Sequence, residues 1–196
     1  MRRGQTPSQT VGPFFAYAMT PEQYGYGYPG IAGPVLVDAD TEGERIALVG
    51  QVFDGDGAAI EDAVIEIWQA DSRGRYAHPA DERGANSTFG GFGRMGTGTD
   101  LESRFLFETV KPGAVGDGQA PQICVIVFAR GLLSHLYTRV YFSDEAAANA
   151  ADPALQSVPE ARRKTLIAAR EETASRPVYR FDIRLQGDNE TVFFDV

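Results

Sequence analysis

The sequence of 196 residues is acidic, with 27 Asp and Glu against 18 Lys and Arg and a formal net charge of −9 at pH 7. Nucleic-acid binding depends on clustered basic side chains, and the short run at residues 162–164 is too small a cluster, so we expect no nucleic-acid partner. The hydrophobic share of 43%, with 12 Phe and 8 Tyr, is enough for the core of one folded domain.

The single cysteine excludes an internal disulfide and is typical of a reducing compartment. Arg2 and Arg3 are followed by polar residues where a signal peptide would require an apolar stretch. The apolar runs have the length of strands, so none is expected to span a membrane. These features predict a cytoplasmic protein.

Residues 1–44 mix Pro, Gly and Tyr without a sustained period, which predicts an extended arm with turns. The aromatic side chains of this arm have no helical or strand spacing by which to contact their own domain. They are Phe14, Phe15, Tyr17, Tyr24, Tyr26 and Tyr28. We therefore expect the arm to lie on a partner subunit, and residues 45–196 to form the folded domain.

The next segments predict strands. Residues 46–53 and 63–69 are apolar on both faces and flank the turn at residues 54–57, which predicts two neighbouring buried strands. Residues 105–108, 123–128 and 136–142 predict three more. Apolar and polar residues alternate over residues 179–186, as expected for a strand with one face on a core. The fold class is all-β.

One convincing helix is expected after these strands. Ser157 is placed as an N-cap, Pro159 lies in the first turn, and Glu160 follows at the position of a capping box. Good helix formers continue over residues 161–170. A weaker helical candidate covers residues 144–151 and ends near Pro153.

The glycine pattern at residues 91–96 matches the G-x-G-x-x-G spacing of dinucleotide-binding loops. That motif requires a strand before it and a helix N-terminus after it, because the helix end binds the pyrophosphate. The sequence predicts neither element here, and a glycine motif without this context is a weak signal. We do not expect a nucleotide site.

Two segments, GQVFDGDG at residues 50–57 and EIWQADSRGRY at residues 66–76, resemble the intradiol ring-cleaving dioxygenases. That family holds non-haem Fe(III) with two Tyr and two His, and Tyr76 matches the first tyrosine. Gln122 and Cys124 occupy the two histidine positions. No tyrosine follows the Lys-Pro-Gly turn at residues 111–113. The resemblance therefore implies vestigial metal positions at Tyr76, Gln122 and Cys124, with no metal bound by this chain.

Further segments at residues 6–15, 128–131, 180–187 and 190–195 are similar to the iron-free subunits of this family. The resemblance implies a prealbumin-like β-sandwich or flattened barrel with an extended arm and one or two short helices. It also implies pairing with a homologous iron-bearing β subunit, which holds Fe(III), in a higher oligomer of αβ pairs.

The function implied by the resemblance is intradiol cleavage of 3,4-dihydroxybenzoate (protocatechuate) with O2 to 3-carboxy-cis,cis-muconate, in aromatic catabolism through the β-ketoadipate pathway. No catalytic residue is expected in this chain alone. Thr10 and Pro13 of the arm, and Arg130 at a strand end, are expected to line the substrate pocket of the partner. For Arg130 the alternative is an ordinary surface salt bridge.

Two other functions remain open from the residues. A self-sufficient catechol-type dioxygenase would bind iron through Tyr76, His78 and His135, since phenolate and imidazole suit ferric iron. A non-enzymatic β-sandwich binding module would explain the fold without a metal. Cys124 could be a catalytic thiol, but it lies in a predicted strand, so a buried structural cysteine is expected.

Overall fold

A computed structural model describes residues 4, 6–84, 89–116 and 118–196. Residues 1–3 and 5 of the expected arm, and Asp117 in the segment after the Lys-Pro-Gly turn, lie outside these ranges. Within them, none of the helices has the length and apolar character needed to cross a bilayer.

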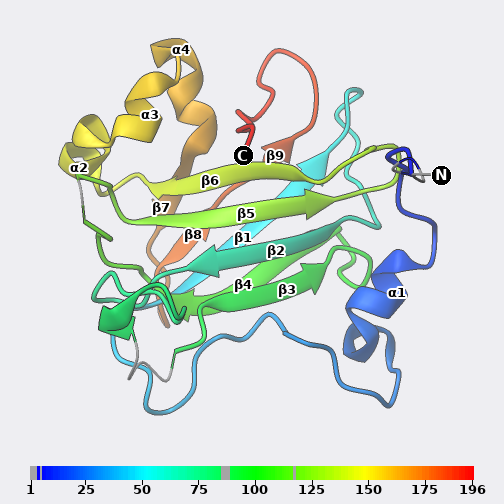
Figure 1. The fold of residues 1–196 in the computed structure, drawn as a ribbon, viewed down its shortest axis with the longest axis horizontal. Helices are drawn as coiled ribbons and strands as arrows, with labels where there is room; N and C mark the ends of the chain where they lie inside the picture. The colour runs from blue at the N-terminus through cyan, green and yellow to red at the C-terminus, as the bar shows by residue number, and fades with distance from the viewer. Residues whose placement is uncertain (1–3, 5, 85–88, 117) are drawn as a thin grey trace.

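The described residues form mainly strands (Figure 1). The strands are β1 (Arg45–Phe53), β2 (Val64–Gln69), β3 (Phe92–Gly96), β4 (Arg104–Val110), β5 (Gln122–Phe128), β6 (Leu136–Phe142), β7 (Ile167–Glu171), β8 (Val178–Arg180) and β9 (Ile183–Arg184). The α-helices are α1 (Phe15–Met19), α2 (Ala146–Ala151), α3 (Pro153–Ser157) and α4 (Glu160–Arg163). Short 3-10 turns are η1 (Pro21–Tyr24), η2 (Glu82–Gly84) and η3 (Lys164–Leu166).

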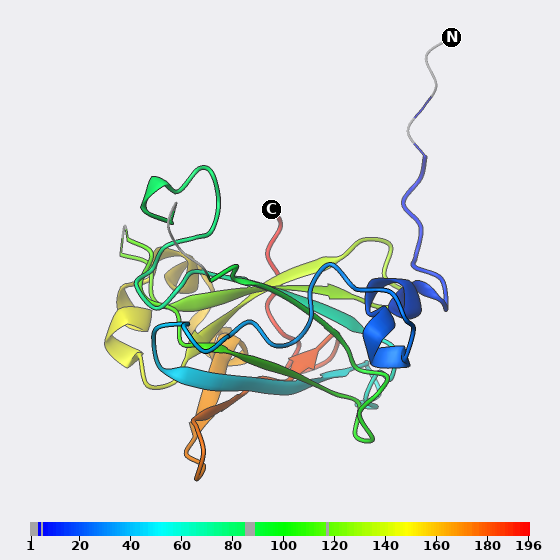
Figure 2. The same cartoon turned by 90° about the horizontal axis from the view of Figure 1, so that it is seen from below.

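The strands belong to one curled sheet in the order β3-β2-β5-β6-β7-β8-β1-β4, with β9 beside β1. Figure 2 shows the two ends of this sheet as layers that face each other. Alternate residues of the strands in both layers meet in a common core that includes Leu48, Ile67, Phe107, Val125 and Tyr179. The expected all-β flattened barrel is confirmed.

The strands predicted over residues 46–53, 63–69, 105–108, 123–128 and 136–142 are all present, but the first two are not neighbours. β1 pairs with β4, β8 and β9, whereas β2 pairs with β3 and β5. The prediction of a neighbouring pair was wrong because the connection at residues 54–63 crosses from one layer to the other. An isolated bridge between Phe53 and Ala59 joins the end of β1 to that connection locally.

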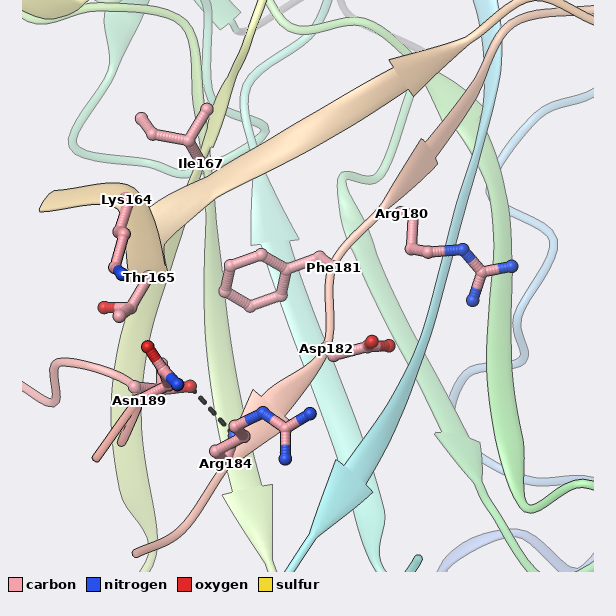
Figure 3. A pocket seen from close by; sticks show the side chains of 9 residues that line it. Lys164, Thr165, Ile167, Arg180, Phe181, Asp182, Arg184 and Asn189 are labelled. Carbon is pink, nitrogen blue, oxygen red and sulfur yellow. Dashed lines mark hydrogen bonds between the residues drawn. The ribbon is translucent and has the colours of Figure 1, made fainter. Parts of the chain in front are cut away.

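The alternation over residues 179–186 is confirmed, although the strand is interrupted. Tyr179, Phe181 and Ile183 are buried, and Figure 3 shows Arg180 and Asp182 on the side of the chain away from the Phe181 ring. These two residues help to line an open polar pocket of about 280 Å³. β8 ends at Arg180 and β9 begins at Ile183 because Phe181 crosses β1 closely. The Phe181 N–H donates to the Val49 carbonyl at 2.8 Å.

That crossing requires glycine at position 50. A Cβ atom on Gly50 would lie 1.8 Å from the Phe181 carbonyl oxygen, which no side chain allows. The glycine belongs to the segment that carried the family resemblance. Its role in the fold is therefore the close approach of two backbones.

The helix expected from Ser157 to residue 170 was wrong in its start and its second half. Asp152 caps α3, accepting from the Leu155 N–H at 2.8 Å, while Ser157 donates to the Ala154 carbonyl. α4 and η3 cover residues 160–166, and β7 then begins at Ile167. Residues 167–171 pair with β6 and β8 and bury Ala168 in the core, so sheet pairing overrides their helix propensity. The weaker candidate at residues 144–151 is confirmed as α2.

The glycine motif at residues 91–96 forms β3, an edge strand that the sequence did not predict. Its glycines fit the chain around them, since a Cβ on Gly93 would lie 2.6 Å from the Leu36 side chain. A turn follows β3 instead of a helix. The strand–loop–helix arrangement of a dinucleotide site is therefore missing at this motif.

Part of the expected arm contacts this chain's own sheet. The Leu36 N–H donates to the Glu108 carbonyl at 2.8 Å, and the Gln23 amide oxygen accepts from the Gly96 N–H at 2.7 Å. Two earlier aromatic residues, Phe14 and Tyr17, remain exposed, and Phe14 is 76% exposed. Figure 2 shows the described part of the arm before α1 extending beyond the layers, which leaves it available to another chain.

Candidate functional site

The vestigial positions meet on the outer face of the β2–β5–β6 layer. On β5, Ile123 and Val125 point into the core, so Gln122 and Cys124, which alternate with them, face away from it. Cys124 pairs with Trp68 on β2 and with Arg139 on β6. This register places a cation beside the two positions where the family has histidines.

Arg139 is bonded directly to one of those positions. Its Nη1 donates to the Gln122 amide oxygen at 3.1 Å, and Gln122 in turn donates to Gln119 at 2.9 Å. The guanidinium carbon lies 5.6 Å from the centre of the Phe194 ring, a cation–π distance. Arg139 Nε is buried and has no hydrogen-bond partner among the described residues.

Cys124 was expected as a buried structural cysteine, and it is partly buried on the outer face of β5 rather than in the core. The Tyr137 hydroxyl donates to its sulfur at 2.9 Å. Burial raises the pKa of the Cys124 thiol and outweighs the opposing effects of Tyr137 and Arg139. A raised pKa keeps the group protonated at neutral pH, so it lacks the thiolate that nucleophilic catalysis needs.

Tyr76 lies beside this group in the loop after β2. Its ring stacks on Trp68 with centroids 5.7 Å apart and an angle of 11°. Burial, and next the nearby Cys124, raise the pKa of Tyr76 to about 12. Its backbone N–H donates to Asp81 at 3.0 Å, which fixes the loop. The phenol is therefore neutral at physiological pH.

The residues present do not fit a ferric ion. A neutral phenol, an amide and a protonated thiol replace charged and imidazole donors, and ligand type largely determines which metal a site holds. Gln122 already hydrogen-bonds to Arg139, whose permanent charge would repel a metal cation at that place. Across the described residues, no three His, Cys, Asp or Glu side chains converge as metal ligands. No step of a reaction can be derived through iron at this site.

The alternative ligand set of Tyr76, His78 and His135 does not assemble. His78 is exposed and accepts from the Ala80 N–H at 3.1 Å within its own turn. His135 packs near Phe128, with ring centres 5.9 Å apart. Phe128 lies about 13 Å along β5 from Cys124 at 3.3 Å per residue, so His135 is at the other end of the strand from Tyr76.

Two of the residues expected to line a partner's pocket come together at that other end. The Gly131 N–H donates to the Thr10 hydroxyl at 2.7 Å, which holds the arm against the loop after β5. Arg130 precedes Gly131, and its side chain is 58% exposed. Pro13 lies further along the arm, exposed, in the turn before α1. The expected emergence of Arg130 at the strand end is confirmed.

A pocket of about 170 Å³ lies between the arm and this loop. Gln9 and Val11 line it from the arm, and Phe128, Leu132 and His135 line it from the strand end and loop. Thr10 lies between the two arm residues in sequence. The arm thus forms one wall of this pocket, and Arg130 follows directly after Ala129, which lines the other side.

Sequence reasoning missed two charged residues of these sites, Arg139 and Asp62. Asp62, just before β2, forms an ion pair with Arg130, just after β5, where these two neighbouring strands end. Arg139 lies in a predicted strand, and nothing in its own segment indicates that β6 would pair it with Cys124 and bring its side chain to Gln122. Their contacts depend on strand pairing, so no local signal could have found them.

Comparisons with known proteins agree with this picture. A family model described as "Dioxygenase" matches residues 19–187. A protein named protocatechuate 3,4-dioxygenase alpha chain from Burkholderia cepacia is 55% identical over 98% of both chains. The alpha chain of that name from Pseudomonas putida is 43% identical and covers 97% of this chain and 96% of the relative. The beta chain from Burkholderia cepacia is 37% identical, over 76% of this chain and 67% of the relative.

Solved structures show the same fold. The dioxygenase domain of a carbohydrate-binding fusion from Streptomyces sp. SirexAA-E matches with a TM-score of 0.59 and 21% identity, over 95% of this chain and 100% of the other. An intradiol ring-cleavage dioxygenase from Tetranychus urticae matches with a TM-score of 0.63 and 18% identity, over 81% and 88%.

Proposed function

Because the chain belongs to the intradiol dioxygenase family as a subunit of the alpha type, we propose that it forms, with an iron-bearing beta subunit, an enzyme that cleaves protocatechuate. The reaction inserts both atoms of O2 and opens the ring between the two hydroxyl-bearing carbons, which gives 3-carboxy-cis,cis-muconate. This places the enzyme in aromatic catabolism through the β-ketoadipate pathway.

The observation that carries the proposal is the 55% identity to an alpha chain over 98% of both sequences. Identity at this level without gaps in coverage supports the same subunit role. The donor set around Tyr76 gives independent support, because an alpha subunit of this kind needs no metal of its own. A named beta chain that is 37% identical to this sequence supports a homologous partner.

The family depends on non-haem Fe(III), and we assign that ion to the beta subunit. Ferric iron there would supply the electron-withdrawing contact that prepares a catechol for O2. This chain's own residues would shape the pocket from across the interface and exclude water from its edge. Thr10 and Pro13 would contribute from the arm and Arg130 from the end of β5.

Arg130 is suited to the part of the substrate that distinguishes protocatechuate from catechol. A guanidinium can bind a carboxylate through two parallel N–H groups. The side chain is exposed in the single chain, and Thr10 of the arm is bonded to the following residue, Gly131. The exposed aromatic residues around Phe14 would be covered by the partner, in a cytoplasmic assembly of several αβ pairs.

Co-expression tests the proposal. The chain and the homologous beta subunit from the neighbouring reading frame would be purified together, and iron content, O2 uptake and product absorbance measured with protocatechuate. We expect a stable complex with one iron per αβ pair and turnover of protocatechuate. Turnover by this chain alone, or a complex that lacks activity despite full iron, would refute the assignment.

A further inference from the structure

Asp62 contacts Arg130 where the neighbouring strands β2 and β5 end, although it belongs to none of the motifs that identify the family. We propose that Asp62 is a positioning residue for Arg130, which fixes the direction in which the guanidinium presents its terminal N–H groups to the carboxylate of an aromatic acid. The inference rests on the proposed function and deepens it, since it concerns how the enzyme would recognise an acidic substrate.

The contact uses only one nitrogen of the guanidinium. Arg130 Nε donates to Asp62 Oδ2, and its guanidinium makes no other hydrogen bond within the described residues. Nε carries one of the five N–H donors, so the outer edge, formed by Nη1 and Nη2, stays free. A carboxylate can bind to that outer edge through two parallel hydrogen bonds.

Asp62 is itself held by its neighbour in the chain. Ala63 is fully buried, its N–H donates to the Thr97 hydroxyl at 3.1 Å, and its carbonyl accepts from the Thr97 N–H at 2.9 Å. The Asp62 side chain is 26% exposed against 58% for Arg130. The carboxylate is therefore the more fixed partner of the pair, and the arginine is the one whose freedom the contact reduces.

Arg130 is thus restrained at two places. Thr10 binds the backbone of the following residue, Gly131, and Asp62 binds the side chain. A free arginine side chain would lose rotational freedom when it binds a ligand, which weakens binding. Prior restraint by Asp62 removes part of that loss.

The carboxylate also has an opposing effect, because its charge partly cancels that of Arg130. Water around an exposed pair screens this effect. An orienting hydrogen bond acts at contact distance and is screened less. We therefore expect the loss of Asp62 to weaken the binding of an acidic substrate, although it makes the surface more positive.

The test uses Asp62→Asn in the complete αβ complex. We expect KM for protocatechuate to rise roughly three- to tenfold, because the amide oxygen of Asn is a weaker and uncharged acceptor for Arg130 Nε, with kcat changed less than about twofold. Asp62→Glu, which restores the carboxylate, should recover part of the loss. Glu61→Gln is the matched control, because it removes the same charge from the exposed preceding residue.

A double variant separates positioning from a general structural effect. In an Arg130→Ala background, Asp62→Asn should raise KM no further, since the residue through which it acts is gone. An equal rise in both backgrounds would overturn the proposal, as would an unchanged KM in Asp62→Asn or an equal rise in Glu61→Gln. A wild-type complex without turnover would instead refute the proposed function.

A crystal structure of the complex gives a second measurement that does not depend on activity. We expect the Arg130 guanidinium to be ordered against Asp62 in the wild type and to be displaced in Asp62→Asn. A guanidinium turned away from Asp62 in the wild-type complex would overturn the proposal.

Discussion

The hydroxyl of Thr10 accepts a hydrogen bond of 2.7 Å from the backbone N–H of Gly131, 121 residues later in the chain. This bond brings the arm to the end of β5, where Arg130 emerges. It gives the arm a fixed place on its own subunit before any partner binds. Residues of an otherwise exposed segment can therefore be presented to a partner together with Arg130.

Replacement of Thr10 by Val should release the arm from this loop. The valine keeps the shape of threonine but accepts no hydrogen bond, so the Gly131 N–H must turn to water. We expect faster proteolysis of the arm in the isolated chain and, in the complex, a KM for protocatechuate raised about two- to tenfold. Thr6→Val is the control, because Thr6 is exposed and its side chain makes no hydrogen bond in the described structure. Equal proteolysis of both variants would contradict the prediction.

Replacement of Arg130 by Ala should impair the recognition of the substrate carboxylate. In the αβ complex we expect KM for protocatechuate to rise about tenfold or more, as loss of a hydrogen bond to a charged group implies. Activity on uncharged catechol should fall less, and iron content should not change. Arg130→Lys should restore only part of the lost affinity for protocatechuate, because the lysine ammonium keeps the charge but lacks the planar pair of N–H donors of arginine.

Arg180→Ala is the control for this experiment, since Arg180 is also exposed but lies on β8. KM for protocatechuate is measured for every variant by steady-state kinetics at low ionic strength. If Arg130→Ala has the KM of the wild type, the residue is an ordinary surface arginine and this chain shapes the pocket only sterically.

Deletion of residues 1–15 should impair assembly and activity together. The deletion removes Thr10, Pro13 and the exposed Phe14, and large apolar interfaces are typical of obligate complexes. Size-exclusion chromatography with the beta subunit, followed by activity measurement, tests this. A truncated chain that still forms a fully active complex would show that the arm does not contribute to the interface.

The isolated chain should bind no stoichiometric ferric iron and should lack the visible absorption of tyrosinate bound to iron. The raised pKa of Tyr76, about 12, keeps the phenol neutral. Gln122, which replaces one histidine, already accepts a hydrogen bond from Arg139 through its amide oxygen. Metal analysis and visible spectra of the purified chain measure this outcome. In the αβ complex, Tyr76→Phe should leave iron content and activity close to wild type. Loss of iron in that variant would show a functional metal site.

Replacement of Gln69 by Leu should destabilise the fold. The side chain is fully buried and links the two layers, donating to the Val110 carbonyl at 2.9 Å and accepting from the Thr109 hydroxyl at 2.8 Å. Leucine leaves these buried groups unpaired, and we expect the free energy of unfolding to fall by about 2–5 kcal/mol. Urea unfolding measures the loss. The exposed Gln186→Leu should change it little, and a similar change in both variants would contradict the argument.

Much of the fold could be predicted from local patterns. Alternation over residues 179–186 and the apolar runs of β1, β2, β5 and β6 appear in the structure as strands. The predictions failed where a partner strand decided the outcome. Residues 167–170 are good helix formers, yet β6 and β8 hold them as β7. β3 was not predicted because glycine is a poor strand former, and in the structure Gly93 lies close against the Leu36 side chain.

The sequence by itself determined the family and the loss of the two histidine donors, because Tyr76 is retained while Gln122 and Cys124 replace the histidines, and these identities can be read without coordinates. Only the tertiary structure decided what surrounds those positions. Arg139 reaches Gln122 through the pairing of β5 with β6, and Asp62 reaches Arg130 through the pairing of β2 with β5. Such contacts join residues far apart in the chain, and their geometry exists only when the sheet has curled and its loops have closed.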